Sequence, residues 1–139
     1  TLDSNAKDFF NNNFYIFSGL FGLLKPLSKI PNYKLKMDGL LMYNFWKPII
    51  TKFLIKEDYI IDLLPQIHKK AYKKSDNSID IEFKIKKNGT IIHSGHQGKV
   101  VKGKFIRFLC ENKINDYDNL KLFTYDGYKW NGKYFLKII

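Results

Sequence analysis

Two contrasting patterns of apolar and polar residues run through the second half of the chain. In residues 78–86, isoleucine or phenylalanine alternates with charged side chains, which is typical of a half-buried strand, and the Asn88-Gly89 pair that follows favours a tight β-turn. In residues 99–111, apolar side chains recur at helical spacing and form one stripe. The stripe consists of Val101, Phe105, Phe108 and Leu109. The sequence therefore predicts a β-hairpin around residue 88 and an amphipathic helix over residues 99–111.

Weaker versions of these patterns predict the remaining elements. Apolar, β-branched or aromatic runs predict strands, helical spacing or a capping residue predicts helices, and glycine-containing dipeptides predict turns. The expected strands are residues 14–17, 33–37 and 59–63; the expected helices are residues 3–10, ended by the asparagines at 11–13, and residues 41–54 and 65–74; residues 123–136 are expected to form a hairpin. Strands and helices interleave, so we expect an α+β fold, a single domain over residues 1–139 with a mixed β-sheet and interleaved helices.

The balance of charges narrows the classes of partner. The 139 residues contain 24 lysines and arginines against 13 aspartates and glutamates, a net charge of +11, and residues 70–139 alone carry +8. Such an excess attracts polyanions, including nucleic acids. Arg107 is the only arginine, however, and a lysine-rich surface that is simply hydrated has the same composition. Charge alone therefore leaves two interpretations open, a polyanion-binding surface and a solvated one.

The residue types that metal binding or export would need are sparse. One cysteine, Cys110, excludes an internal disulfide, and the three scattered histidines lack the paired spacing of a zinc site. No signal peptide is recognisable, and the most apolar run, residues 14–24, is too short to cross a bilayer. We therefore expect a cytoplasmic protein without a metal, a cofactor or a membrane partner. Because residue 1 is a threonine within polar, helix-like sequence, we also expect the chain to be a piece of a longer protein.

The helix predicted over residues 99–111 has a second face of unusual composition. Lys99, Gly103 and Arg107 follow one another at i, i+4 and i+8, opposite the apolar stripe, and Lys102 lies beside them. Glycine inside a helix costs roughly 1 kcal/mol relative to alanine, and one use for that cost is close approach of a ligand. The pattern favours an anion held between the two cations. The alternative is a solvated face whose glycine packs against another element.

A second candidate lies in the turn after the first predicted strand, residues 18–26. A strand followed by a glycine-bearing turn is one way in which α/β folds bring backbone N–H groups to a ligand. The spacing fits neither a Walker loop nor a dinucleotide-binding fingerprint, and two glycines at a strand end more often form only a turn. Ser18 has no recognisable His and Asp partners, so the catalytic residues of this chain, if it has any, are unknown.

Several segments, in the same order, resemble the YaaA family of peroxide stress proteins. Residues 18–26 (SGLFGLLKP) and 30–37 (IPNYKLKM) are similar to the family's SGLYG, LRPLD and PYRLEMG motifs. Residues 99–108 (KVVKGKFIRF) resemble the family's KxxRGxMxRF, and residues 123–130 (FTYDGYKW) resemble FxxxGYxF. In this chain Lys25 and Lys102 stand where the family has arginine, which keeps the charge but loses the bidentate geometry.

The resemblance implies a function that composition does not. It implies a cytoplasmic protein of the oxidative stress response, with a positively charged cleft, DNA binding and no securely attached enzymatic activity. It also implies that the chain corresponds to the C-terminal portion of a YaaA-like fold. Residues 62–68 depart from the family's NLAS-x-EY segment, so the resemblance does not carry any chemistry of that segment over to this chain.

Two functional hypotheses follow. The first is DNA binding through a basic cleft, with lysines contacting phosphates. The cleft residues would be Lys25, Lys99, Lys102, Gly103 and Arg107. The alternative is an enzyme that acts on a nucleotide or nucleobase, with the turn as a pocket wall and the helix cations holding a phosphate. The motif residues in and after the turn are Ser18, Gly19, Gly22, Pro26 and Tyr33. A third interpretation is that all of these motifs only determine the fold.

Overall fold

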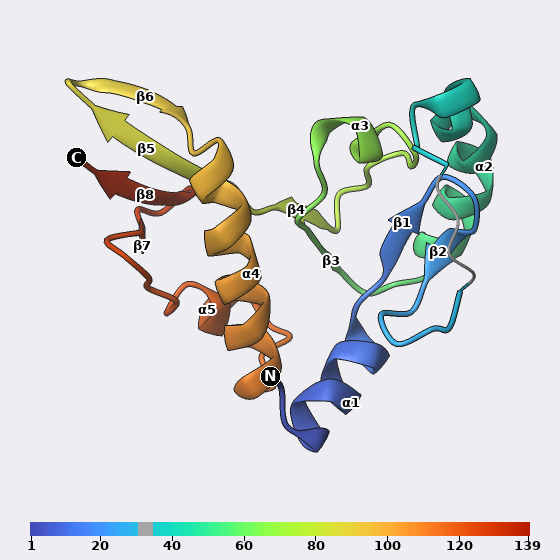
Figure 1. Ribbon diagram of the computed structural model, residues 1–139, viewed down its shortest axis with the longest axis horizontal. Coiled ribbons are helices and arrows are strands. Elements are labelled where there is room, and N and C mark those ends of the chain that lie inside the picture. Colours follow the sequence, from blue (N-terminus) through green and yellow to red (C-terminus); the bar gives the residue numbers. More distant parts are fainter. Residues whose placement is uncertain (31–34) are drawn as a thin grey trace. The chain divides into compact units, whose positions relative to one another are not determined.

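The computed structural model describes residues 1–30 and 35–139, which form two compact units (Figure 1). Unit 1 consists of residues 1–13 and 81–139, and unit 2 consists of residues 14–80. Both units contain helices and strands, which confirms the predicted α+β class. The expectation of a single domain stays a prediction.

Unit 1 is a four-stranded mixed sheet with three helices (Figure 1). Its strands are β5 (Phe83–Lys87), β6 (Thr90–His93), β7 (Lys129–Trp130) and β8 (Phe135–Ile138), and its helices are α1 (Ser4–Asn13), α4 (His96–Glu111) and α5 (Tyr117–Leu120). The strand order is β6-β5-β8-β7, with β5 antiparallel to β6 and parallel to β8. Helix α4 packs against β5, and α1 packs against α4. The sheet thus positions one face of α4 towards the core of this unit.

An aromatic cluster forms the core of unit 1. Four phenylalanines in this core are only 0–4% exposed, and the ring centres of every pair lie 5.1–6.4 Å apart. They come from β5, α4, the segment after α5, and β8. These residues are Phe83, Phe105, Phe123 and Phe135. The buried Tyr128 hydroxyl donates to Ser94 Oγ at 2.7 Å, and Ser94 Oγ donates to the carbonyl oxygen of Phe83 at 3.0 Å. The few polar atoms in this core are therefore hydrogen-bonded to one another, as buried polar groups require.

Local turn chemistry places the hairpins of unit 1 where the sequence predicts them. Asn88 and Gly89 have φ values of 51° and 77° between β5 and β6, the backbone conformation that favours this residue pair. At the C-terminal end, β7 and β8 pair antiparallel across a turn containing Gly132 at a φ of 97°. The hairpin predictions at residue 88 and within residues 123–136 are confirmed.

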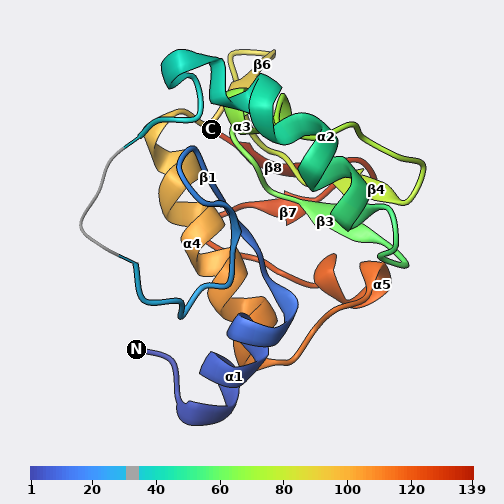
Figure 2. The same ribbon diagram turned by 90° about the vertical axis from the view of Figure 1, so that its right-hand side faces the viewer.

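Unit 2 contains a long helix, α2, which Figure 2 shows, and its described residues form two separate two-stranded sheets. Its elements are β1 (Ile16–Ser18), β2 (Gly22–Leu24), the 3-10 helix η1 (Gly39–Leu41), α2 (Met42–Leu54), β3 (Ile60–Asp62), α3 (Gln66–Lys69) and β4 (Ser78–Asp80). Strands β1 and β2 form an antiparallel hairpin, and β3 and β4 pair in parallel through a connection that contains α3. The helix predicted over residues 41–54 and the strand predicted over residues 59–63 are confirmed.

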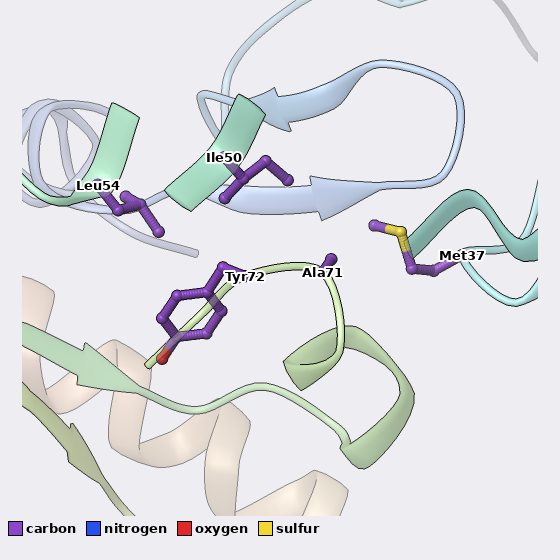
Figure 3. Packing of buried hydrophobic residues seen from close by; sticks show 5 residues of the cluster. All are labelled: Met37, Ile50, Leu54, Ala71 and Tyr72. Atoms are coloured by element: carbon purple, nitrogen blue, oxygen red, sulfur yellow. The ribbon is translucent and has the colours of Figure 1, made fainter. Parts of the chain in front are cut away.

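The core of unit 2 is smaller than that of unit 1 and mostly aliphatic. It consists of Met37, Ile50, Leu54, Ala71 and Tyr72, which are 0–6% exposed. Figure 3 shows Ile50 and Leu54 pointing from α2 towards Tyr72 and Ala71. Partly buried side chains, among them Phe17, Leu23 and Trp46, pack around this cluster.

The strand predicted over residues 14–17 is observed as β1 over residues 16–18. Three other predicted elements end or divide at other residues than expected, because an interaction overrides the local pattern. Helix α1 continues through the asparagines to Asn13, whose side-chain amide donates to the carbonyl oxygen of Phe9 at 2.9 Å. The helix predicted over residues 65–74 ends at Lys69, because Ala71 and Tyr72 turn into the core. The strand predicted over residues 78–86 is divided into β4 and β5, since its two halves pair with different strands.

One predicted strand falls partly outside the described residues. Of the segment 33–37, the structure describes Leu35 to Met37, and these residues are not in a strand. Met37 instead contributes its side chain to the core of unit 2. Among the residues that the structure describes, no helix combines the length and the apolar character that a bilayer crossing demands.

Candidate nucleic-acid interface

Helix α4 presents its apolar stripe to the core of unit 1, as its periodicity predicts. Val101, Phe105 and Leu109 are 0–2% exposed, and Phe108 is half-buried. The helix begins at His96, three residues earlier than the pattern indicates, after Gly95 at a φ of 59°. Because the stripe is fixed by burial, the residues opposite to it point away from the core of this unit.

The face of α4 opposite the stripe carries Lys99, Gly103 and Arg107. Lys99 and Gly103 are exposed and Arg107 is half-exposed. Apart from the backbone of α4 itself, no described atom lies within 4 Å of the position that a Cβ atom would take at Gly103. The structure therefore contains no packing contact that requires glycine at this position.

The guanidinium of Arg107 is held by two partners within unit 1. Its Nε donates to Glu111 Oε1 at 3.0 Å, one turn along the helix, and its Nη2 donates to the carbonyl oxygen of Thr1 at 3.2 Å. An exposed ion pair of this kind contributes little to stability, but it fixes the direction of the side chain. The guanidinium has five N–H donors, so these two bonds leave capacity for an anion.

Two further lysines flank this face. Lys102 lies on the same helix and is half-buried, and Lys104 is exposed with its Nζ 5.8 Å from the ring centre of Tyr125. The only acidic residue in α4 is Glu111. The N-terminal three turns of this helix thus present lysines without an acidic residue of their own, which gives the face a positive potential.

The glycines of the turn after β1 are explained by packing within unit 2. A Cβ atom at Gly19 would clash with the carbonyl oxygen of Leu35, and one at Gly22 would lie 2.6 Å from the indole ring of Trp46. Trp46 Nε1 also donates to the carbonyl oxygen of Gly19 at 2.7 Å. Glycine is required here because a helix side chain and another backbone segment approach the turn closely. These contacts account for both glycines without a ligand.

The other motif residues lie around the same hairpin. Ser18 Oγ accepts a hydrogen bond from the backbone N–H of Phe21 at 3.1 Å and so stabilises the turn. Lys25 is exposed directly after β2, and its carbonyl oxygen accepts from the backbone N–H of Ser28 at 3.0 Å; Pro26 is half-buried. Tyr33 lies outside the described residues. The structure therefore brings Lys99, Lys102, Gly103 and Arg107 together on α4 and places Lys25 in the other unit.

A charged network in unit 2 is the feature that sequence reasoning missed. Asp62 and Asp80 are register partners at the carboxyl ends of the parallel strands β3 and β4. Asp62 is 3% exposed and accepts from Leu64 N at 2.8 Å, Lys69 Nζ at 3.0 Å and Tyr72 Oη at 2.5 Å. Lys69 Nζ also donates to Asp80 at 3.0 Å, and Lys74 pairs with the same carboxylate.

The pKa values in this network follow its hydrogen bonds. Burial lowers the pKa of Lys69, but the hydrogen bonds to Asp62 and Asp80 outweigh burial and raise it. Burial raises the pKa of Asp80, but the bonds from Lys74 and Lys69 outweigh it and lower the pKa of this carboxyl. Burial, together with the bond to Asp62, raises the pKa of Tyr72. Lys69 and Asp80 thus stay charged near neutral pH, and each charged group of the network is matched by a partner, which indicates a structural role.

The sequence does contain a signal for this network. Each aspartate stands at the end of a short apolar run that the structure shows as a parallel strand, and functional or structural polar groups often gather at that edge. The pairing of the two strands, which joins residues 18 positions apart in register, is not visible in local patterns.

The described part of the chain contains neither a reactive thiol nor a cluster of metal-binding side chains. Burial and the nearby Glu111 raise the pKa of the Cys110 thiol to about 11, so this thiol is unreactive at neutral pH. Among residues 1–30 and 35–139, no three His, Cys, Asp or Glu side chains lie close enough to hold a metal ion. A hollow of about 490 Å³ in unit 2 is lined by Lys47, Pro48, Thr51, Lys52, Ile55 and Lys73. A second hollow of about 280 Å³ shares Thr51, Ile55 and Lys73 with it and is also lined by Tyr72 and Lys74. Neither hollow is lined by the turn after β1.

Comparison with known proteins identifies the family. The family model described as "Peroxide stress protein YaaA" matches residues 1–134. A UPF0246 protein of Clostridioides difficile (strain 630) is 34% identical over 136 residues, which cover 89% of this chain and 55% of the relative. A UPF0246 protein of Francisella philomiragia is 32% identical over 146 residues, which cover 94% and 58%, and one of Rickettsia bellii (strain OSU 85-389) is 32% identical over 146 residues, which cover 95% and 59%.

The match is nearly complete on the side of this chain and partial on the side of the relatives. This chain spans somewhat more than half the length of the curated relatives that it matches. Helix α4 and the turn after β1 lie within the matched residues 1–134, and β8 begins directly after them. The chain belongs to the family described as peroxide stress protein YaaA.

Proposed function

We propose that this chain is part of an oxidative stress protein that binds DNA through a basic surface centred on α4. The role in peroxide stress is supported by the family to which the chain belongs. DNA as the partner is supported by the net charge of +11 and by the cations of α4. In this proposal Lys99, Lys102 and Arg107 contact phosphates from unit 1, and Lys25 stays a separate expectation for unit 2.

The observation that carries the proposal is the open surface at Gly103. A glycine within a helix destabilises it by roughly 1 kcal/mol relative to alanine. Gly19 and Gly22 are required by Trp46 and by the backbone at Leu35, but no described neighbour requires Gly103. Its position between Lys99 and Arg107 allows a phosphate backbone to approach the helix and both cations closely.

Salt dependence of duplex DNA binding tests the phosphate contacts. Lys99→Ala/Arg107→Ala should weaken binding and make the plot of log affinity against log salt shallower, by about 0.9 for each phosphate that the variant no longer neutralises. Lys129→Ala/Lys133→Ala is the matched control, because it removes the same charge from exposed positions of unit 1 outside α4. Equal slopes for the two double variants would show that net charge, and not this face, determines the affinity.

Gly103→Ala separates binding from folding. Because a Cβ atom at this position meets no described neighbour, alanine should raise the free energy of unfolding by about 0.5–1 kcal/mol. If α4 receives a phosphate backbone, the same methyl group should weaken DNA binding while the protein becomes more stable. Stabilisation without any loss of affinity would contradict close approach at Gly103.

The alternative, an enzyme that acts on a nucleotide or nucleobase, has less support. It relies on the turn after β1 as a pocket wall, and the contacts of Gly19 and Gly22 with Trp46 and the backbone at Leu35 already account for both glycines. The hollows found in unit 2 are lined by other residues. A rise in melting temperature with one mononucleotide out of a broad panel would restore this alternative.

A further inference from the structure

Helix α2 carries apolar side chains over more of its circumference than the core of unit 2 buries. Successive residues of a helix are rotated by about 100°, so Phe45, Ile49 and Phe53 form one stripe, and Ile50 and Leu54 form a neighbouring one. Ile50 and Leu54 are 1% and 6% exposed. In contrast, Phe45, Ile49 and Phe53 are 58%, 50% and 36% exposed. The first stripe therefore lies beside the core but outside it.

The exposed stripe is a contiguous patch along α2. Lys47 and Thr51 lie on the other side of the helix, and Lys52 lies beside the stripe, next to Phe45 in rotation about the helix axis. Phe45 packs edge-to-face on Trp46 with ring centres 5.0 Å apart, and Phe53 packs on Tyr15 at 5.5 Å. Their rings are thus held in place, and a patch of aligned apolar side chains marks an interaction surface more often than scattered exposed residues do.

The strands of unit 2 also lack the neighbours that usually complete a sheet. Within the part of unit 2 that the structure describes, β1 pairs only with β2, and β3 pairs only with β4. Isolated two-stranded sheets are marginally stable in water, and a third strand or additional packing normally stabilises them. The apolar stripe of α2 and the open strand edges indicate that unit 2 is built to be covered by further polypeptide.

We propose that the Phe45–Ile49–Phe53 stripe docks polypeptide equivalent to the portion of the family's longer members that has no match in this chain. The relatives from Clostridioides, Francisella and Rickettsia are matched over only 55–59% of their length. More than two fifths of each relative is therefore available to bury this patch.

A second copy of the chain fits the stripe less well. Lys52 lies beside it, and α2 contains no acidic residue. A symmetric pairing of two α2 helices would bring like charges together, which is destabilising. An intramolecular or heterologous apolar partner has no such conflict.

Cysteine accessibility tests the proposal in intact proteins. Ile49→Cys is introduced into this chain, and a cysteine is placed at the aligned position of the full-length Clostridioides difficile relative; Lys47→Cys and its aligned counterpart are the controls. In this chain both cysteines should react rapidly with a maleimide, at a rate that does not depend on protein concentration, while Cys110 stays buried. In the full-length relative, the cysteine aligned with Ile49 should react at least tenfold more slowly than the one aligned with Lys47.

Two results would overturn the proposal. Equal labelling of the two positions in the full-length relative would mean that the face is not covered by the rest of that protein. Protection of Ile49→Cys in this chain that increases with protein concentration would mean that a second copy occupies the stripe. Circular dichroism and Trp46 fluorescence check that the half-exposed Ile49 is replaced without loss of the fold.

Discussion

Unit 1 and unit 2 are stabilised in different ways. Unit 1 buries four mutually contacting phenylalanines, and its sheet has four strands in one layer. Unit 2 buries a smaller, mostly aliphatic cluster around Tyr72 and adds a charged network at the ends of two parallel strands. It also leaves three large apolar side chains of α2 exposed.

The difference lies in where the exposed apolar side chains stand. Unit 1 leaves aliphatic residues exposed on its strands, such as Ile92 on β6 and Ile138 on β8, whereas unit 2 leaves a stripe with two phenylalanines exposed on α2. Burial of an apolar side chain stabilises a fold by about 1.5–3 kcal/mol relative to exposure, and α2 forgoes part of that gain at Phe45, Ile49 and Phe53. The charged network of unit 2 does not compensate fully, because a buried ion pair loses hydration energy when it forms. We therefore expect unit 1 to be the more stable unit in this chain.

The largest effect should come from the aromatic core of unit 1. Phe105 is fully buried, so Phe105→Ala should lower the free energy of unfolding of unit 1 by about 3–5 kcal/mol. Phe108→Ala is the matched control on the same helix, and it should cost clearly less because Phe108 is only half-buried. Labelling of Cys110 in urea reports the opening of unit 1. Similar losses for the two variants would show that the cluster is not the main source of stability.

A smaller effect is expected at the buried carboxylate of unit 2. Asp62→Ala leaves the Tyr72 hydroxyl and the Leu64 N–H without the carboxylate that accepts their hydrogen bonds. This should lower the free energy of unfolding by about 1–3 kcal/mol. Lys69 retains Asp80, so the loss should stay below that of a fully orphaned buried charge. Urea unfolding followed by Trp46 fluorescence, in a Trp130→Phe background, measures this unit. Asp76→Ala, an exposed aspartate near the network, should change little.

The same network gives unit 2 a defined pH dependence. The pKa of Asp80 lies below 3.8 in the folded protein, so its stabilising contribution is present above that value and is lost as the pH falls through the lowered pKa. The pKa of Lys69 lies above 10.5, so its contribution persists through neutral pH and is lost only in strong alkali. Between these limits the stability of unit 2 should change little with pH.

Asp80→Asn should remove the acid limb of this profile. The effect should be smaller than that of Asp62→Ala, because the Asp80 side chain is 35% exposed and solvent screens its ion pairs. Trp46 fluorescence at fixed urea concentration, recorded from neutral pH to below the ordinary aspartate pKa, measures it. An unchanged acid transition in Asp80→Asn would assign the pH dependence to other carboxylates.

Local features of the fold could be predicted from the sequence, and non-local ones could not. The Asn88-Gly89 pair favours the tight turn between β5 and β6 through its own backbone conformation. The apolar stripe of α4 follows from the helical spacing of its apolar residues. The division of residues 78–86 into β4 and β5 could not be predicted, because the alternation is the same on both sides of the break and only the pairing partners differ. The Asp62–Asp80 register depends on that same distant pairing.

The candidate site shows the same limit. Helical spacing predicts that Lys99, Gly103 and Arg107 share one face of α4. Only the folded structure shows that no described neighbour requires glycine at position 103, whereas neighbours do require Gly19 and Gly22. Gly19 and Gly22 resemble a ligand-binding turn in the sequence because the side chain that fills the space, Trp46, is more than twenty residues away along the chain. The hydrogen bond between Arg107 and Thr1 joins residues 106 positions apart and leaves no local pattern.

The smallest effect should come from the periphery of unit 1, at the start of α1. Asp3 Oδ1 accepts a hydrogen bond from the backbone N–H of Ala6 at 2.8 Å and so caps this helix. Asp3→Ala should lower the free energy of unfolding by about 0.5–1 kcal/mol. This is near the low end of the range for such caps, because Asp3 is exposed. Asp3→Asn keeps the side-chain oxygen and should restore most of the loss. Amide exchange at Ala6 and Lys7 measures the helix end directly, while Cys110 labelling shows whether the aromatic core responds. If Asp3→Asn loses as much as Asp3→Ala, the charge of Asp3 near the helix N-terminus, rather than its hydrogen bond, stabilises α1.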